Sequence, residues 1–385
     1  MSFRLLQYSD SHLGFRQYNS IERLRDFAEV LDEVLRVAIE MNVDAVVDTG
    51  DTFDSPNPDP YSLAAFRRFL EKLHQQGIQF LGIVGNHNRH EMQSKMDGAS
   101  WLDAASDHVI RPSNPETPIR MTSRDGSSTI QVVAADWMPS SDIPAFLSRI
   151  PKGVDALFMH QSCERFLPAI AKTELTLSQI DGIASYVGVG DIHVTGTLKT
   201  QKGTIVGSAG STEMASRGES PEKFVMAVTL FPEEPGRAPV VQVSGIETRG
   251  LVTFPSITLP EHIVPMLDRV RQGIVPGKKA PMVIVPFARR LQAEVSVAQE
   301  KIREMGVTIV RFVPETDVKK SEDMVEITRS GSILMESIIG EILSSDGDKE
   351  ALGLALELWS AQNNAQDVIN SYIQRIEKEY ENQGD

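Results

Sequence analysis

The chain has 385 residues, of which 41% are hydrophobic and 24% are charged, a composition typical of globular proteins rather than disordered or fibrous ones. Its length favours two or three domains, and its formal net charge is −15. With one cysteine, Cys163, it can form neither an internal disulfide nor a cysteine-based zinc site. No apolar run approaches the ~20 residues of a membrane span, and Ser9-Asp10 follows the N-terminus too closely for a signal peptide, so we expect a soluble cytoplasmic protein.

Residues 1–245 alternate short apolar runs with amphipathic helices, which predicts an α/β layer fold. Apolar residues at helical spacing between Leu24 and Ala38 predict a first helix. Asp59-Pro60 is typical of the start of a second helix, which we expect to end at Gly77. Five apolar runs of strand length predict buried strands at residues 3–8, 43–47, 78–84, 156–159 and 186–189.

Two further parts follow in the chain. Residues 246–325 are predicted to form a small α+β domain with strands at 252–259, 282–287 and 307–312 and helices at 263–270 and 291–305. Residues 326–385 are predicted to form a linker and amphipathic helices.

Charge is segregated between these two parts. Residues 249–320 hold 12 basic and 7 acidic residues, a balance of +5. This block either lines the path of a DNA phosphate backbone or is an ordinary solvated surface. Residues 331–385 hold 11 acidic and 3 basic residues, a balance of −8. The predicted helices there either bind a partner or pack back on the body.

Residues that can bind metals follow each of the five predicted strands. They are Asp10 and His12, then Asp51 and Asp54, then Asn86 and His87, then His160, and finally Asp191 and His193. Because open α/β sheets assemble their sites at the carboxyl ends of strands, we expect these side chains at one sheet edge. Seven of them offer oxygen or imidazole donors without thiolates, a set that suits two divalent ions, with manganese favoured over a closed structural zinc site: Asp10, His12, Asp51, Asn86, His160, Asp191 and His193.

Glycines precede three of these residues. Gly50, Gly85 and Gly190 each lie one residue before a proposed ligand, as expected where the backbone turns sharply or approaches a metal and phosphate closely. One such fragment alone is weak evidence, whereas five in order, each ending a strand, strongly favour a metal centre.

These fragments resemble the five sequence blocks of the calcineurin-like metallophosphoesterases. The blocks are Asp10-Ser11-His12, Gly50-Asp51-Thr52-Phe53-Asp54, Gly85-Asn86-His87-Asn88, Met159-His160-Gln161 and Gly190-Asp191-Ile192-His193. Four fragments resemble, more narrowly, the SbcD-type nuclease subunit of the double-strand-break repair complex: Asp10-Ser11-His12-Leu13-Gly14-Phe15, the Gly50–Asp54 block, His160-Gln161 and Gly210-Ser211-Thr212-Glu213. The resemblance covers the first predicted domain; order and architecture alone extend it to the other two.

The resemblance implies a fold and a set of partners. The fold would be a metallophosphoesterase β-sandwich flanked by helices (1–245), with a small α+β DNA-capping domain (246–325) and a helical segment (326–385) that docks an SMC-like coiled-coil ATPase. The protein would be a homodimeric, manganese-dependent DNA exonuclease and endonuclease in recombination and repair, with magnesium as a second possible ion.

The resemblance also implies residue roles. One metal would be held by Asp10, His12, Asp51 and His193, and the other by Asp51, Asn86, His160 and Asp191, with Asp51 bridging. His87 would stabilise or protonate the phosphate or the leaving group, and Asp54 would assist catalysis. Alternatively, Asp54 caps the loop before the second helix.

Two positions depart from the family pattern. Asp191 stands where the family usually has histidine, so it is either a ligand that favours harder ions or a residue behind the ligands. Asn88 stands where an acidic residue is usual, which removes a carboxylate that would raise the pKa of His87. They keep two alternatives open: a small-molecule phosphodiesterase or phosphatase with the same site, and a scaffold whose site has decayed.

The other histidines and the cysteine belong to none of these blocks. We expect His74, His90, His108 and His262 at the surface or in structural hydrogen bonds, and Cys163 as a small buried residue.

Overall fold

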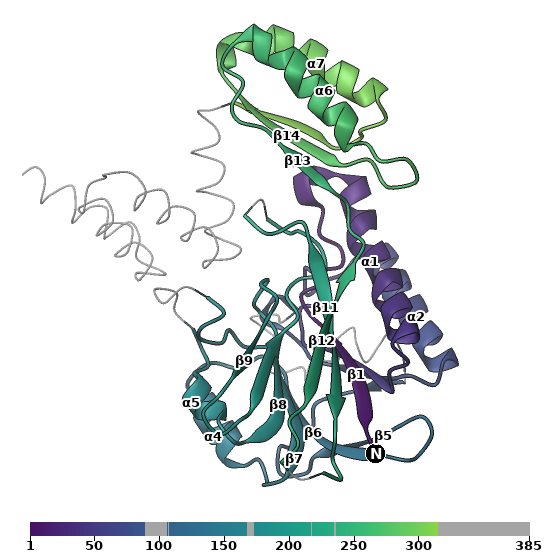
Figure 1. Cartoon of the computed structure of the whole chain (residues 1–385), viewed down its shortest axis with the longest axis vertical. Helices are drawn as coiled ribbons and strands as arrows, with labels where there is room; N and C mark the ends of the chain where they lie inside the picture. Colours follow the sequence, from purple (N-terminus) through teal and green to yellow (C-terminus); the bar gives the residue numbers. More distant parts are fainter. Residues whose placement is uncertain (89–105, 107, 168–172, 217, 235, 315–385) are drawn as a thin grey trace, which may run out of the picture. The chain divides into compact units, whose positions relative to one another are not determined.

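A computed structural model describes residues 1–88, 106, 108–167, 173–216, 218–234 and 236–314 (Figure 1). Residues Met1–Phe312 form one compact unit, and Val313–Asp385 form a second that lies almost entirely outside the described residues. The predicted helices of residues 326–385 are among those outside this description, and the predicted boundaries at 245 and 325 stay predictions. Within the described ranges, no helix combines the length and apolar character that crossing a bilayer requires.

The first sheet contains the three predicted strands nearest the N-terminus. Its order is β12-β11-β1-β2-β3-β4. Strands β1 to β4 run parallel, β11 pairs antiparallel with β1, and β12 pairs antiparallel with β11. Its strands are β1 (Phe3–Tyr8), β2 (Ala45–Asp48), β3 (Gln79–Gly82), β4 (Val109–Ile110), β11 (Lys223–Leu230) and β12 (Val240–Ile246).

Two long helices cover the outer face of this sheet, α1 (Ile21–Glu40) and α2 (Pro60–Gln75) (Figure 1). The side chain of Asp59 accepts hydrogen bonds from the first backbone N–H groups of α2, which confirms the predicted start at Asp59-Pro60. The apolar faces of both helices pack with Leu6 and Tyr8 of β1 in one buried cluster. Both predicted helices are therefore confirmed.

The second sheet contains the other two predicted strands. Its order is β5-β6-β7-β8-β10-β9, and short helices α4 (Ile143–Ser148) and α5 (Leu177–Ile180) pack on its outer face with β7 and β8. Its strands are β5 (Ile119–Thr122), β6 (Thr129–Ala135), β7 (Val154–Met159), β8 (Ala184–Val189), β9 (Gly196–Lys199) and β10 (Ile205–Ser208).

The inner faces of the two sheets pack on each other. Because side chains alternate along a strand, Phe3 and Leu5 of β1 point inward, where they share one buried cluster with Phe158 of β7 and Tyr186 of β8. The part of the first unit that holds these two sheets is thus layered as helices, sheet, sheet and helices. This confirms the β-sandwich and corrects the expectation of one open sheet: the five predicted strands are divided between two sheets, because strand pairing is not a local property of the sequence.

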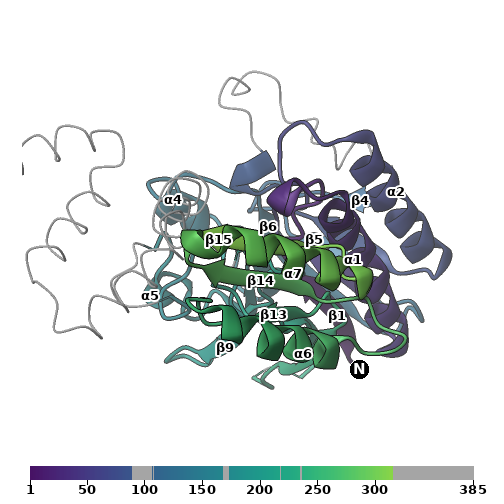
Figure 2. The same ribbon diagram turned by 90° about the horizontal axis from the view of Figure 1, so that it is seen from above.

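A small third sheet of order β13-β14-β15 carries two helices on one face (Figure 2). Its elements are β13 (Leu251–Thr253), η3 (Pro260–His262), α6 (Ile263–Gly273), β14 (Met282–Phe287), η4 (Arg289–Leu291), α7 (Gln292–Glu304) and β15 (Val310–Pro314). The predicted strand at 252–259 is wrong beyond Thr253, because Pro255 has no N–H to donate to a ladder; Ile257 forms only an isolated bridge. The strand predicted at 307–312 is present as β15, which begins three residues later and ends two residues later than predicted.

A buried ion-pair network lies at the start of α1. Arg23 is fully buried and bonds to Asp26 at 3.0 Å and to Glu213 at 3.2 Å. Asp26 also pairs with Arg249 at 2.6 Å and Lys279 at 3.0 Å. The network therefore joins α1 to three other segments: the one after β10, the one between β12 and β13, and the one between α6 and β14.

Candidate metal centre

The predicted ligands lie just beyond the ends of five strands. Asp10 and His12 follow β1, Asp51 follows β2, and Asn86 begins the 3-10 helix η2 (Asn86–Asn88) after β3. From the second sheet, His160 follows β7, and Asp191 and His193 follow β8. The sandwich brings the same end of both sheets together, so the centre is built from two sheet edges instead of the one that the sequence predicts.

The backbone of these loops is strained at the ligands themselves. Asp10, His12, Asp51 and Asp191 have φ values of 51°, 42°, 52° and 67°, in the left-handed region that non-glycine residues rarely adopt. Strain of this kind costs of order 1–3 kcal/mol per residue and clusters at functional sites. Backbone hydrogen bonds at 2.9 Å from Asp10 N to the Gly50 carbonyl and from His12 N to the Asp51 carbonyl hold the two loops together.

All three of the predicted glycines let the backbone approach a ligand closely, and a Cβ atom at Gly190 would lie 2.6 Å from Nδ1 of His160. A Cβ atom at Gly50 would lie 2.6 Å from Cγ of His160, and one at Gly85 would lie 2.6 Å from Cγ and from the backbone nitrogen of Asp51. Ordinary contacts between carbon atoms need about 3.5 Å. The prediction of close approach is therefore confirmed at all three glycines.

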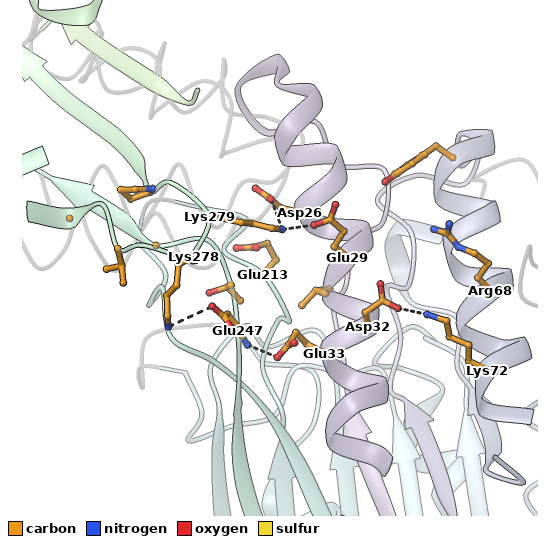
Figure 3. Close-up of a pocket in the computed structure, with 18 residues that line it drawn as sticks. Asp26, Glu29, Asp32, Glu33, Arg68, Lys72, Glu213, Glu247, Lys278 and Lys279 are labelled. Carbon is orange, nitrogen blue, oxygen red and sulfur yellow. Dashed lines mark hydrogen bonds and ion pairs between the residues drawn. The ribbon is translucent and has the colours of Figure 1, made fainter. Parts of the chain in front are cut away.

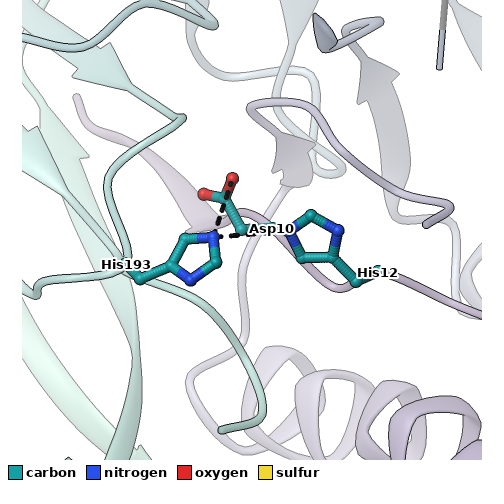
Figure 4. A group of neighbouring side chains, drawn as sticks. All are labelled: Asp10, His12 and His193. Carbon is teal, nitrogen blue, oxygen red and sulfur yellow. Dashed lines mark hydrogen bonds and ion pairs between the residues drawn. The ribbon is translucent and has the colours of Figure 1, made fainter. Parts of the chain in front are cut away.

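The first group of ligands is Asp10, His12 and His193 (Figure 4). The Nε2 atoms of His12 and His193 are 3.3 Å apart, and Nε2 of His193 is 3.8 Å from Oδ1 of Asp10. Burial lowers the pKa of His12 to about 3, so this imidazole is neutral and its nitrogen is available to a metal. Burial also raises the pKa of Asp10.

The second group surrounds Nε2 of His160. This atom is 3.1 Å from Oδ1 of Asn86, 3.3 Å from Oδ2 of Asp51 and 3.9 Å from Oδ1 of Asp191. The other ring nitrogen, Nδ1, is 2.8 Å from the backbone carbonyl of Thr49, which fixes the ring. Although burial opposes its charged form, the Asp51 carboxylate holds the pKa of His160 well above its ordinary value.

Asp191 lies at the edge of this second group, with a side chain one quarter exposed. Desolvation raises its pKa to about 7, and the nearby carboxylates of Asp10 and Asp51 act in the same direction. The residue common to the two compact triads, Asp10–His12–His193 and Asp10–Asp51–His160, is Asp10. The bridging role of Asp51 and the ligand role of Asp191 stay predictions.

The chemistry of the site fits divalent cations. Both carboxylate oxygens of Asp10 are buried, and within the described part of the chain neither accepts a hydrogen bond. A buried carboxylate without partners is costly unless a cation balances it. Oxygen and neutral imidazole donors are the ligands that such cations prefer.

Comparisons with known proteins agree with this geometry. The family model of calcineurin-like phosphoesterases matches residues 3–142, a range that includes Asp10, His12, Asp51, Asn86 and His87. The chain carries a calcineurin-like metallophosphoesterase domain.

Curated relatives of the chain are named DNA double-strand break repair protein Mre11. The relative from Methanosarcina acetivorans is 32% identical over 239 residues, which cover 60% of this chain and 37% of that protein. The relative from Saccharolobus solfataricus is 26% identical over 227 residues and 56% of each chain, and that from Haloferax volcanii is 29% identical over 327 residues, 83% of this chain and 69% of that protein. The first two are thus matched over less than two thirds of their own length.

His87 and Asp54 stand beside the metallophosphoesterase ligands. Together with His12 they form a third compact group, in which His12 Nδ1 is 3.7 Å from Asp54 Oδ1 and the rings of His12 and His87 meet edge to face. The backbone N–H of His87 donates to Oδ1 of Asp51 at 3.1 Å. His87 is only partly buried, so its ring can meet a substrate.

Sequence reasoning missed Glu219. Its Oε1 atom accepts a hydrogen bond from Nδ1 of His193 at 2.9 Å, and its own side chain is 4% exposed. The separation of 26 residues from His193 gives no periodic signal. The spacing of Glu219 and Lys223, which form an ion pair at 2.6 Å, is the one pattern that would have drawn attention to it.

The remaining histidines and the cysteine lie outside the centre. Cys163 is buried, and burial raises its pKa to about 12, which confirms an inert small residue. His74 and His108 are exposed and stack on each other at 3.6 Å, and His262 is exposed. His90 and the side chain of Asn88 lie outside the described residues.

A separate hollow of about 800 Å³ is lined by α1, α2 and the segment around Lys278 (Figure 3). None of the predicted ligands lines it. Its acidic side chains face cations: Lys72 is 2.7 Å from Asp32, and Lys278 is 3.6 Å from Glu247. This mutual pairing distinguishes it from the metal centre, where carboxylate and imidazole groups converge without lysine or arginine.

Proposed function

We propose that this chain is a two-metal phosphodiesterase that cleaves DNA. The observation that carries the proposal is the convergence of seven predicted ligands from five strand ends on two adjacent groups, one around Nε2 of His193 and one around Nε2 of His160. Two divalent ions bound side by side would suit in-line displacement at a phosphate. Manganese is the preferred ion of the proposal, because aspartate and asparagine oxygens outnumber imidazoles in the second group.

DNA is proposed as the substrate because the curated relatives are named as DNA double-strand break repair proteins. We further propose that the small sheet β13–β15 and its helices serve as a DNA-capping domain. The residues 326–385 would dock an SMC-like coiled-coil ATPase, and the chain would act as a homodimer. If removal of residues 331–385 left co-purification with that partner unchanged, the docking proposal would be wrong.

The residues of the chain would divide the chemistry among them. When bound, the ions supply Lewis-acid activation of the attacking water and of the phosphate. Asp54 lies on the Nδ1 side of His12 and keeps the Nε2 side of that ring turned toward His193. His87, anchored through its backbone to Asp51 and partly open to solvent, would donate a hydrogen bond or a proton to the phosphate or the leaving oxygen.

The test is cleavage of end-labelled double- and single-stranded DNA in manganese, magnesium or chelator. We expect manganese-dependent cleavage by the wild type and a loss of at least about 100-fold in Asp51→Ala and His87→Ala. His262→Ala, which removes an exposed histidine outside the centre, is the matched control and should cleave normally.

The other outcomes separate the alternatives. Turnover of bis-p-nitrophenyl phosphate without DNA cleavage, with two ions bound, would replace DNA by a small phosphodiester as substrate. Binding of fewer than two manganese ions, without turnover of either substrate, would identify a scaffold with a decayed site.

A further inference from the structure

Glu219 is buried behind the metal centre, on the side of His193 that faces away from the ligands. Its carboxylate accepts hydrogen bonds from Nδ1 of His193 at 2.9 Å, from Oγ of Ser211 at 2.9 Å and from the backbone N–H of Ser216 at 3.0 Å. Nζ of Lys223 lies 2.6 Å from its other oxygen. Because these donors approach from several directions, the carboxylate has one orientation available.

This carboxylate determines which nitrogen of His193 can bind a metal. When the ring is neutral and its Nδ1–H donates to Glu219, the lone pair is on Nε2. Nε2 is the atom that lies 3.3 Å from Nε2 of His12 and 3.8 Å from Oδ1 of Asp10. The hydrogen bond therefore fixes both the tautomer and the direction of the ligand atom.

Two of the three imidazoles among the predicted ligands, those of His160 and His193, are supported differently. Nδ1 of His160 meets a neutral backbone carbonyl, that of Thr49, whereas Nδ1 of His193 meets a carboxylate. A carboxylate partner makes the opposite ring nitrogen a stronger donor to a metal than a carbonyl does. Of these two rings, His193 alone is held by a side chain that mutation can remove.

We propose that Glu219 is a positioning residue for the metal bound by Asp10, His12 and His193. Glu219 orients His193 and strengthens its Nε2 as a ligand, while Ser211 and Lys223 hold the carboxylate in place. The inference rests on the proposed two-metal function and deepens it, because it makes the affinities of the two ions separately adjustable.

Lys223 is the reason why one substitution is not enough to test this. Its side chain is 3% exposed, and it bonds to Glu219 and to Oγ of Ser211. Removal of Glu219 alone leaves a buried ammonium group without its counter-ion, which destabilises the fold whatever Glu219 does for the metal. Replacement of both residues by apolar side chains removes the buried charge and leaves His193 without its acceptor.

The experiment is calorimetric titration of the full-length chain with manganese, accompanied by thermal unfolding in chelator; the titration is done at alkaline pH, so that a proton on His193 does not compete with the metal in any variant. The variants are Glu219→Leu, Glu219→Gln, which keeps one oxygen as an acceptor, and the pair Glu219→Leu with Lys223→Met. Glu213→Leu is the matched control, because Glu213 is equally buried, pairs with Arg23 at 3.2 Å and lies in the same segment, but bonds to none of the predicted ligands.

We expect two manganese ions on the wild type. In Glu219→Leu and in the double variant, one ion should bind about 10–100-fold more weakly and the other should be unchanged. Glu219→Gln should lie between these and the wild type. Glu213→Leu should unfold at a lower temperature in chelator but bind both ions with wild-type affinity.

The possible failures are distinguishable. If the double variant bound both ions like the wild type, Glu219 would have only a structural role and the inference would be overturned. The inference would also be wrong if Glu213→Leu weakened one ion as much as Glu219→Leu did, because the loss would then follow stability. Binding of fewer than two ions by the wild type itself would overturn the proposed function.

Discussion

Gly85 offers the sharpest test of the geometry around Asp51. A Cβ atom added there would lie 2.6 Å from Cγ and from the backbone nitrogen of Asp51, and closer still to Oδ1. Contacts between such atoms need about 3.5 Å, so in Gly85→Ala the alanine and Asp51 must separate by about 1 Å. Since Gly85 has no left-handed φ, the substitution acts through this contact rather than through backbone strain.

The magnitude follows from how precisely metal ligands must be placed. Metal–ligand distances tolerate only about 0.2 Å, so a shift of about 1 Å takes the Asp51 carboxylate out of range. We expect manganese affinity to fall by at least about tenfold, and DNA cleavage by about 100-fold, as for other misplacements of this size. Overpacking of a tight site should reduce the free energy of unfolding by about 1–3 kcal/mol.

The assay is titration with manganese and kcat/KM on DNA, with chemical unfolding in chelator. The matched control is Gly245→Ala in β12, where the nearest atom to an added Cβ is 4.0 Å away; this variant should bind manganese and cleave DNA normally. If Gly85→Ala also bound and cleaved like the wild type, the close approach to Asp51 would not exist as described.

Three further predictions concern protons. Although burial opposes the charged form, Glu219 stabilises it and raises the pKa of His193 to about 9, so manganese must displace a proton from this ring. The apparent affinity for manganese should therefore rise from about pH 6 to pH 9, and calorimetric titration in buffers of different ionisation enthalpy should detect the released proton. Arg249 and Lys279 hold the pKa of Asp26 below its ordinary value despite burial, so the ion pairs of Asp26 contribute stability above about pH 4 that is lost on further acidification. Below that pH, the free energy of unfolding measured in urea should fall less steeply in Asp26→Asn than in the wild type, and an equal pH dependence of the two proteins would contradict this. Asn88→Asp should shift the pH–rate profile of DNA cleavage upward in pH, and coincident profiles would be evidence against a catalytic imidazole next to it.

The residues that converge at the candidate centre could be predicted because each follows a strand within a few residues along the chain. Apolar runs ending before Asp10, Asp51 and His160 indicate both the strand and the place where it stops. A glycine next to a ligand is likewise a local signal, and the structure gives it a cause in the tight approaches of Gly50 and Gly85. Local patterns were sufficient for the candidate residues because the site is made of strand ends.

The sheets could not be predicted in the same way. Continuous apolar runs indicate central strands that are covered on both faces, such as β1 and β7. Strands near a sheet edge, such as β9 and β12, are largely exposed or alternate, so they give weaker patterns. Which strands share a sheet depends on pairing between distant segments, and periodicity contains no information about it.

Buried charges were the other gap. Glu219 with Lys223 reads in sequence as an ordinary exposed pair four residues apart, and Arg23 with Asp26 reads as part of the polar face of α1. All four are buried because their partners come from elsewhere in the chain, as Arg249 does for Asp26. Sequence alone therefore predicted the residues that converge at the candidate centre, but not those that hold them in place.

The structure separates stability from function along each strand. The inner and outer faces of β1 are filled by Phe3, Leu5, Leu6 and Tyr8, all fully buried. Immediately after the strand, Asp10 takes a left-handed conformation and leaves two buried oxygens without hydrogen bonds in the part of the chain described. Such a costly residue persists only because the packed strand before it and the backbone bonds to the neighbouring loop determine its position. The same physical argument explains why the cost is tolerated: a cation placed among these side chains would balance the carboxylate that the described part of the fold leaves without hydrogen bonds.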